Sequence, residues 1–147
     1  MIDQEIRGLF KKANKVGLTS HKRPDGDAIG SILGLGLALV DAGKEVQMVL
    51  RDGVSHTFRH LPGADLIKRS FKDECDPYIV LDCSDLDRTG NTLDGRSVDL
   101  VIDHHITNEG FGTHNLVDAD AVATCAILAE RLPAWGLRFT TQIASVL

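Results

Sequence analysis

The sequence predicts an α/β domain with a mainly parallel β-sheet flanked by helices. Two observations support this prediction. Short apolar runs rich in β-branched residues, which are typical of buried strands, recur along the chain, and helical patterns separate several of them. The first two such runs enclose a helical run, and a β-loop-α-β unit of this kind favours parallel strands. Because 147 residues is the length of one ordinary domain, we expect residues 1–147 to form a single domain.

The composition is that of a globular protein with no general affinity for membranes or for long nucleic acid. Hydrophobic residues make up 43% of the chain and charged residues 25%, and the net charge is −5, so no overall positive field would attract either partner. The N-terminus leads directly into charged residues, and no apolar run is long enough to span a bilayer. The three cysteines lack zinc-type spacing. We therefore expect a cytoplasmic protein with reduced thiols.

In the N-terminal half, hydrophobic periodicity predicts four elements. They are a helix over 2–15, a strand over 16–20, a helix over 28–42 and a strand over 45–50. The second helix is apolar on nearly every side, as expected of a helix that is buried against a sheet. Asp3 is in position to cap the first helix, and Gly43 is in position to end the second one as a left-handed residue.

The C-terminal half continues the alternation of strands and helices. The predicted elements are a brief strand at 66–67, strands over 78–81 and 100–102, an edge strand over 115–117, and helices over 120–132 and 140–147. His56, His60 and His114 are expected to be surface or loop residues.

Three of the predicted strands end in side chains that bind metals or transfer protons. These are His21 with Asp25 and Asp27, then Asp82, and then Asp103, His104 and His105. Each group has an ordinary alternative: the first is also a turn signal, the second also fits a loop cap, and the third also fits a solvated loop. However, the carboxyl ends of parallel strands lie along one edge of the sheet, where open α/β sheets bind ligands. The recurrence of such groups favours one common site.

The charges of the candidate residues indicate a metal site. Four aspartates gathered at one edge would repel each other, because two like charges 4 Å apart cost about 4 kcal/mol at an effective dielectric constant near 20. Divalent ions would remove this cost, and mixed imidazole and carboxylate donors suit Mn²⁺, Fe²⁺, Co²⁺ or Zn²⁺ better than Ca²⁺. The donors are too many for one tetrahedral ion. They favour a pair of ions bridged by a carboxylate, an arrangement that activates water against phosphorus.

The candidate residues also resemble the motifs of a known family. Three segments of this chain resemble the first three motifs of the DHH phosphoesterases, a family of the RecJ-like superfamily. The segments are His21-x-x-Pro24-Asp25-Gly26-Asp27-Ala28-x-Gly30-Ser31, Asp82-Cys83-Ser84-Asp85 with Arg88, and Asp103-His104-His105. Later residues resemble one branch of this family more closely, the bifunctional oligoribonuclease/pAp phosphatases. They are Asn108-x-x-Phe111-Gly112, Asn115, Val117-Asp118 and Ala123-Thr124. The resemblance runs from about residue 16 to the end of the chain.

This resemblance implies roles for individual residues. One metal ion would be held by His21, Asp25 and Asp82, and a second one by Asp27, Asp82 and His104, so that Asp82 bridges the two. His105 would contact the phosphate or assist the leaving group, and Asp103 would orient the imidazoles. The implied ions are Mn²⁺, with Mg²⁺, Co²⁺ or Fe²⁺ as alternatives.

Other residues near these motifs allow two interpretations each. Arg88 is a candidate for contacting substrate or stabilising its loop, with a salt bridge as the alternative. Lys22 and Arg23 could steer a phosphate group, although two solvated charges are the simpler interpretation. Cys83 is expected to be a small buried residue rather than a nucleophile.

The resemblance implies a Mn²⁺-dependent phosphoesterase that acts on short oligoribonucleotides or pAp-like nucleotides. Hydrolysis of cyclic dinucleotides or pyrophosphate is an alternative activity, and a catalytically impaired module that binds metal, nucleotide or another protein is an alternative class. The family has a further metal-binding Asp and a small substrate domain beyond the point that corresponds to Leu147. We therefore expect an incomplete DHH domain with weak activity and with apolar surface that promotes self-association into a homo-oligomer.

Overall fold

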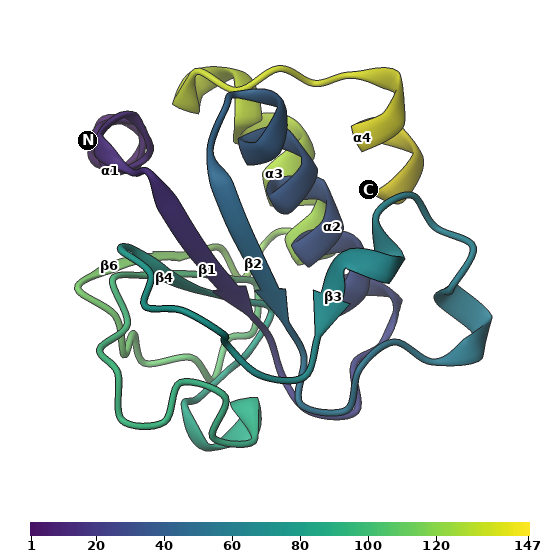
Figure 1. Cartoon of the computed structure of the whole chain (residues 1–147). Helices are drawn as coiled ribbons and strands as arrows, with labels where there is room; N and C mark the ends of the chain where they lie inside the picture. Colours follow the sequence, from purple (N-terminus) through teal and green to yellow (C-terminus); the bar gives the residue numbers. More distant parts are fainter.

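The computed structural model describes all 147 residues, and they form one sheet of six parallel strands covered by helices (Figure 1). The strand order is β3-β2-β1-β4-β5-β6. In chain order the strands are β1 Lys15–Thr19, β2 Glu45–Val49, β3 Ile67–Lys68, β4 Tyr78–Leu81, β5 Leu100–Asp103 and β6 His114–Val117. The helices are α1 Ile2–Lys12, α2 Gly26–Asp41, α3 Thr124–Arg131 and α4 Thr141–Val146, with short 3₁₀ turns η1–η4 between elements. The predicted α/β class with a parallel sheet is confirmed.

Alternating side chains of the strands give the sheet two buried faces. Ile79 and Leu81 of β4 belong to the main core of 26 buried residues, to which all four α-helices also contribute. Tyr78 and Val80 point the other way, into a smaller core of seven residues that the loops after β3 and β4 cover. Helices therefore cover one face of the sheet and irregular segments cover the other.

The predicted buried helix is α2, and it packs against both the sheet and the later helices. Asp25 caps it by accepting a hydrogen bond from the backbone N–H of Ala28 (2.9 Å). After its last turn, Gly43 adopts φ +87°, as predicted from its position. A β-carbon at Gly30 would lie 2.6 Å from the carbonyl oxygen of Val146 in α4, so this glycine permits the close approach of the two helices. No helix has both the length and the apolar character that a bilayer span requires.

The strand order reverses direction at the centre of the sheet, between β1 and β4. From β1 the chain proceeds outward through β2 and β3, and it then returns to place β4 on the other side of β1. From β1 the chain runs toward one edge of the sheet, and from β4 it runs toward the other edge. Open α/β sheets bind their ligands at the carboxyl ends of the strands beside such a reversal. In Figure 1 the arrowheads of β1 and β2 point to this edge, at the bottom of the view.

The predicted helix over 120–132 is wrong at its start, because α3 begins only at Thr124. The cause is a tertiary contact. The first two backbone N–H groups of α3 are bound by the carboxylate of Asp27, which comes from α2. This carboxylate replaces a local cap, since Ala123 at the N-cap position offers no side-chain acceptor.

Smaller corrections concern three other segments. Asp3 is not a cap but lies in the first turn of α1, where it accepts hydrogen bonds from Trp135 and Arg131. The brief strand lies at 67–68 rather than 66–67, and α1 ends at residue 12 rather than 15. His114 is not a loop residue, because it lies in β6 with Nδ1 3.3 Å from the Glu5 carboxylate.

The packing around Gly30 predicts a contrast between two helical glycines. Gly30→Ala should lower the free energy of unfolding by about 1–3 kcal/mol, because the new methyl group must displace backbone of α4. Gly8→Ala in α1 should instead raise it by up to about 1 kcal/mol, because nothing lies within 4 Å of its added β-carbon and alanine favours the helix. Urea unfolding of both variants checks the contrast, and equal effects would contradict the packing described.

Candidate metal centre

The structure brings seven of the predicted site residues to the carboxyl edge of the sheet. His21 lies just beyond β1, Asp25 and Asp27 lie at the start of α2, Asp82 follows β4, and Asp103, His104 and His105 end β5 and begin its loop. Asp82 has φ +53°, a left-handed conformation that only a few per cent of non-glycine residues adopt. Its backbone N–H still continues the ladder to β5, through a 2.9 Å bond to the carbonyl of Ile102.

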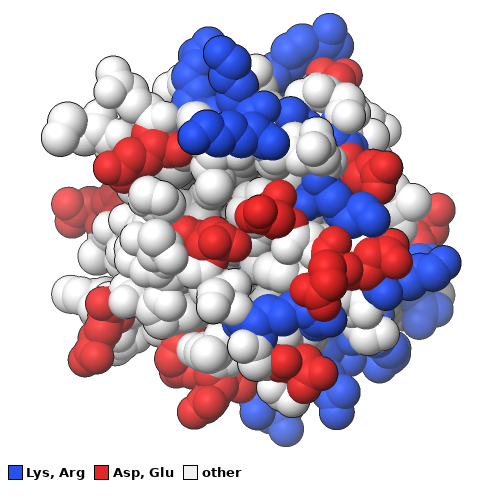
Figure 2. All heavy atoms as spheres, turned by 60° about the vertical axis from the view of Figure 1, so that its left-hand side comes forward, with Lys and Arg blue, Asp and Glu red and all other residues white.

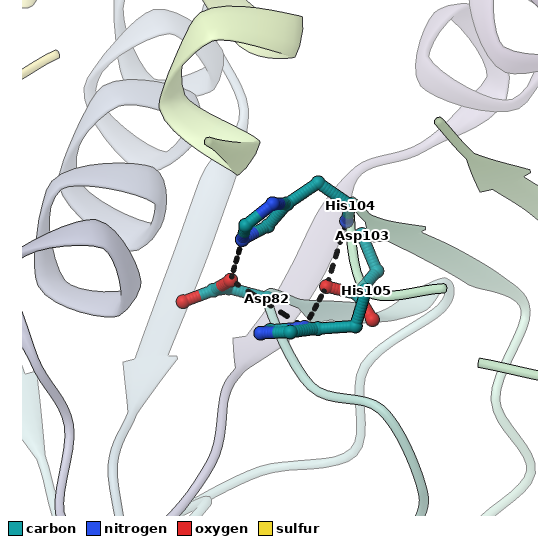
Figure 3. Close-up of side chains that lie close together, drawn as sticks. All are labelled: Asp82, Asp103, His104 and His105. Atoms are coloured by element: carbon teal, nitrogen blue, oxygen red, sulfur yellow. Dashed lines mark hydrogen bonds and ion pairs between the residues drawn. The ribbon is translucent and has the colours of Figure 1, made fainter. Parts of the chain in front are cut away.

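The two oxygens of Asp82 face two separate groups of side chains. Oδ2 lies 3.6 Å from Nε2 of His21, which itself lies 3.7 Å from Oδ1 of Asp25. Oδ1 lies 3.5 Å from Nε2 of His104, which lies 3.4 Å from Oδ2 of Asp27. These are the two groups into which the family resemblance divides the ligands. Figure 3 shows the imidazoles of His104 and His105 approaching the Asp82 carboxylate from two sides.

A hydrogen bond sets the tautomer of His21. Nδ1 of His21 lies 2.7 Å from the carbonyl oxygen of Lys22, and because a carbonyl only accepts, this nitrogen carries the proton. In the neutral ring, Nε2 then presents its lone pair to Asp82 and Asp25. This is the form of histidine that binds a metal ion while its other nitrogen donates to a backbone carbonyl.

Asp103 positions the two histidines that follow it. Its Oδ1 accepts hydrogen bonds from the backbone N–H of His104 (2.8 Å) and from Nδ1 of His105 (2.7 Å). Its Oδ2 accepts from the side-chain amide of Asn108 (2.8 Å). The carboxylate is fully buried, and both of its oxygens are occupied. It therefore fixes the backbone of His104 and the imidazole of His105.

Two residues of α3 complete the site, and the sequence alone indicated no role for either of them. Thr124 donates its hydroxyl to Oδ1 of Asp82 (3.1 Å) and its backbone N–H to Oδ2 of Asp27 (3.0 Å). Cys125 donates its backbone N–H to Oδ1 of Asp27 (2.9 Å). Thr124 and Asn108 both occur in the motifs quoted for the resemblance, and this was their only signal in the sequence. Cys125 acts through its backbone, which the identity of its side chain does not reveal.

The environment shifts the pKa values of the central residues in opposite directions. Burial raises the pKa of Asp82, and the negative charges of Asp27 and Asp25 raise it further against the opposing attraction of the His21 ring. Burial also pushes the pKa of Asp27 upward, but the N–H groups of Cys125 and Thr124 outweigh it and leave this pKa below its usual value. The carboxylate of Asp82, 3.6 Å from Nε2, raises the pKa of His21 because it favours the charged imidazolium.

The donor set fits divalent cations because no Lys or Arg side chain compensates its negative charge. No Lys or Arg side chain forms an ion pair with any of the four aspartates, and Asp82 is only 1% exposed. A buried carboxylate without a cationic partner is costly to the fold. Bound metal ions are the strongest local charges that a protein site can acquire, and they reverse this cost.

Other candidate residues lie around the centre. The guanidinium of Arg88 is exposed and forms no ion pair, so the salt-bridge alternative is wrong. The backbone of Arg88 instead joins two loops, because its carbonyl accepts the N–H of Lys22 at 2.7 Å. Cys83 is buried, which raises its pKa to about 12, and this agrees with a packing role rather than a nucleophilic one. His56 and His60 take no part in the site.

Comparison with protein families and characterised proteins gives consistent matches. The family model "DHH family, N-terminal domain" matches residues 15–146. The bifunctional oligoribonuclease and PAP phosphatase NrnA of Thermus thermophilus is 32% identical over 135 residues. These residues are 87% of this chain but only 39% of the relative, so the chain spans well under half of that protein.

Solved structures share the fold. An exopolyphosphatase-related protein from Bacteroides fragilis superposes with a TM-score of 0.84 at 24% identity, over 92% of this chain and 44% of the other. The exonuclease RecJ bound to manganese superposes with a TM-score of 0.57 at 14% identity, over 99% and 41% of the two chains. At these identities the likeness concerns the fold alone.

The raised pKa of Asp82 predicts that metal ions stabilise the fold through this residue. Below about pH 3.8 the carboxyl is neutral in both the folded and the unfolded chain and does not lower the free energy of unfolding. Near pH 7 it is more easily ionised in the unfolded chain, and this difference destabilises the metal-free protein. Asp82→Asn should therefore raise the melting temperature of the metal-free chain near pH 7. Mn²⁺ at 100 times its Kd should stabilise the wild type by about 2.7 kcal/mol but should scarcely affect the variant. Thermal scans with and without Mn²⁺ check both effects.

Asp94→Asn is the matched control for this experiment. Asp94 also has a positive φ (49°), but it is exposed and forms no hydrogen bond or ion pair with the residues of the metal centre. It should respond to Mn²⁺ as the wild type does. An undiminished Mn²⁺ effect in Asp82→Asn would contradict the central position of Asp82.

Proposed function

The chain belongs to the DHH family, and on this premise we propose that it is a metal-dependent phosphoesterase that hydrolyses phosphate esters of short oligonucleotides or pAp-like nucleotides. The observation that carries the proposal is the buried carboxylate of Asp82, whose two oxygens face two groups of metal-binding donors. The relative from Thermus thermophilus, described as an oligoribonuclease and PAP phosphatase, supports this substrate class. A cytoplasmic location and self-association stay predictions.

We assign the ligands as the family resemblance divides them. His21, Asp25 and Asp82 would hold one ion, and Asp27, Asp82 and His104 would hold the other. Mixed carboxylate and imidazole donors suit Mn²⁺, with Mg²⁺, Co²⁺ or Fe²⁺ as alternatives. Two such ions, when bound, supply an activated water and neutralise charge on the phosphate oxygens.

The remaining residues would bind and orient the substrate. His105 is 42% exposed at its side chain, and Asp103 fixes its Nδ1 proton, so Nε2 is free to contact a phosphate oxygen or to give a proton to the leaving group. The exposed, unpaired guanidinium of Arg88 lies on the neighbouring loop and is suited to a substrate phosphate. Thr124 and Asn108 would hold the carboxylates in place.

The charges on one face of the molecule and the net charge favour short substrates over long nucleic acid. On the face in Figure 2, basic groups gather at the upper edge, and elsewhere acidic and basic side chains are interspersed without a continuous basic stripe. The net charge of −5 points the same way. Long nucleic acids are held mainly by rows of Lys and Arg that neutralise successive phosphates.

A substrate panel tests the proposed activity. With Mn²⁺, the chain should hydrolyse di- to pentaribonucleotides and pAp faster than cyclic dinucleotides or pyrophosphate, and chelation should abolish the activity. Asp82→Asn should lower kcat/KM at least 10²-fold, because both ions lose a ligand, whereas Asp94→Asn should not change it. Metal binding without hydrolysis of any panel member would favour the non-catalytic module instead.

Two substrates with different leaving groups distinguish two roles that His105 could have. If this residue gives a proton to the departing oxygen, His105→Gln should lower kcat about 10²-fold on a dinucleotide, whose leaving alkoxide needs the proton. The same variant should lower kcat only slightly on a p-nitrophenyl ester, because the p-nitrophenolate leaving group departs without a proton. Steady-state kinetics on both substrates measures the difference. An equal loss on both would assign His105 to phosphate binding instead.

A further inference from the structure

We propose that a cavity of about 320 Å³ beside the metal centre is a nucleoside site, which takes the ribose and base attached to the scissile phosphate. This inference rests on the proposed phosphoesterase function and extends it to the orientation of the substrate. The cavity is formed by two loops that also carry the metal centre. Its lining residues are Ser84, Asp85, Thr107, Glu109, Gly110 and Phe111.

The position of the cavity follows from the chain on either side of it. Ser84 lies two residues after Asp82, and Thr107 lies two residues after His105. Two residues of extended chain span at most about 7 Å, so the cavity adjoins both the central carboxylate and the exposed imidazole. A nucleoside bound there would present its phosphate to the metal centre.

The cavity walls share their support with the metal centre. Asn108 donates from its side-chain amide to the carbonyl of Cys83 (3.1 Å) and to the Asp103 carboxylate (2.8 Å). Its side-chain oxygen accepts the backbone N–H of Gly110 (2.8 Å), which has the positive φ of 80° that this turn requires. The residue that anchors Asp103, which in turn orients His105, therefore also holds the two cavity loops together.

The lining chemistry favours a nucleoside over a phosphate. Phe111 packs against the smaller core while it lines the cavity, so it offers an aromatic surface on which a base can stack. Asp85 and Glu109 would repel a phosphate, but their carboxylates can accept hydrogen bonds from ribose hydroxyls and from base amino groups. The volume lies at the lower end of the roughly 300–1,000 Å³ typical of small-molecule pockets.

Exposed basic residues lie on the loops that follow β1, β2 and β4, at the same edge of the sheet. Lys22, Arg23, Arg51 and Arg88 are exposed there, and none of them forms an ion pair. Their loops are joined, because the N–H of Arg23 donates to the Asp52 carboxylate at 2.6 Å and Arg51 packs on Gly90. A substrate would therefore lie with its nucleoside in the cavity and its further phosphates over these cations.

Binding of two small phosphates tests the nucleoside site without relying on turnover. Calorimetric titration in Mn²⁺ compares adenosine 5′-monophosphate with ribose 5-phosphate, which has the same sugar and phosphate but no base. The wild type should bind the nucleotide about tenfold more tightly, because the base stacks on Phe111. Phe111→Leu keeps an apolar residue in the core but should abolish this preference, and Phe111→Tyr should restore it.

Phe139→Leu is the matched control, because Phe139 is an exposed aromatic residue outside the cavity. This variant should prefer the nucleotide over ribose 5-phosphate as strongly as the wild type does. Hydrolysis of methyl p-nitrophenyl phosphate, which has no nucleoside, reports separately on the proposed function. If the wild type hydrolyses this ester but binds both phosphates equally, or if Phe111→Leu keeps the preference, the nucleoside site is overturned. A wild type that cannot hydrolyse the ester would overturn the proposed function instead.

Discussion

The site depends on one buried carboxylate that has no Lys or Arg side chain to neutralise it. Asp82 is 1% exposed, and it is surrounded by histidines and other aspartates. Like charges about 4 Å apart cost about 4 kcal/mol each at an effective dielectric constant near 20, a large fraction of the stability of a small domain. Bound divalent cations would offset this cost, and they suit the donors present.

The topology places this carboxylate where two parts of the chain can share it. Because β4 lies beside β1, the end of one strand delivers Asp82 between the loop after β1 and the loop after β5. The left-handed backbone of Asp82 turns the chain at once after the strand. The start of α3 closes the arrangement, since its N–H groups bind Asp27 and its threonine binds Asp82. Helix packing and ligand geometry are therefore coupled, and a change in one should be transmitted to the other.

Most of the framework could be predicted from the sequence because strands and their ends carry local signals. The apolar runs located β1, β2, β4 and β5 to within about two residues, and the groups at their ends predicted a common site. Features that arise from tertiary contacts could not be predicted in this way. Asp27 caps a helix almost 100 residues further along the chain, Asp3 binds Trp135 instead of capping its own helix, and Cys125 acts through its backbone. None of these pairings has a local pattern.

The number and coupling of bound Mn²⁺ ions test the central role of Asp82 most directly. Titration followed by electron paramagnetic resonance should show two ions per chain in the wild type, with the altered signal of a spin-coupled pair. Asp82→Asn should bind no coupled pair, because it lacks the carboxylate that we propose bridges the two ions. A wild-type chain that binds only isolated ions, or a variant that retains the coupled pair, would contradict the account.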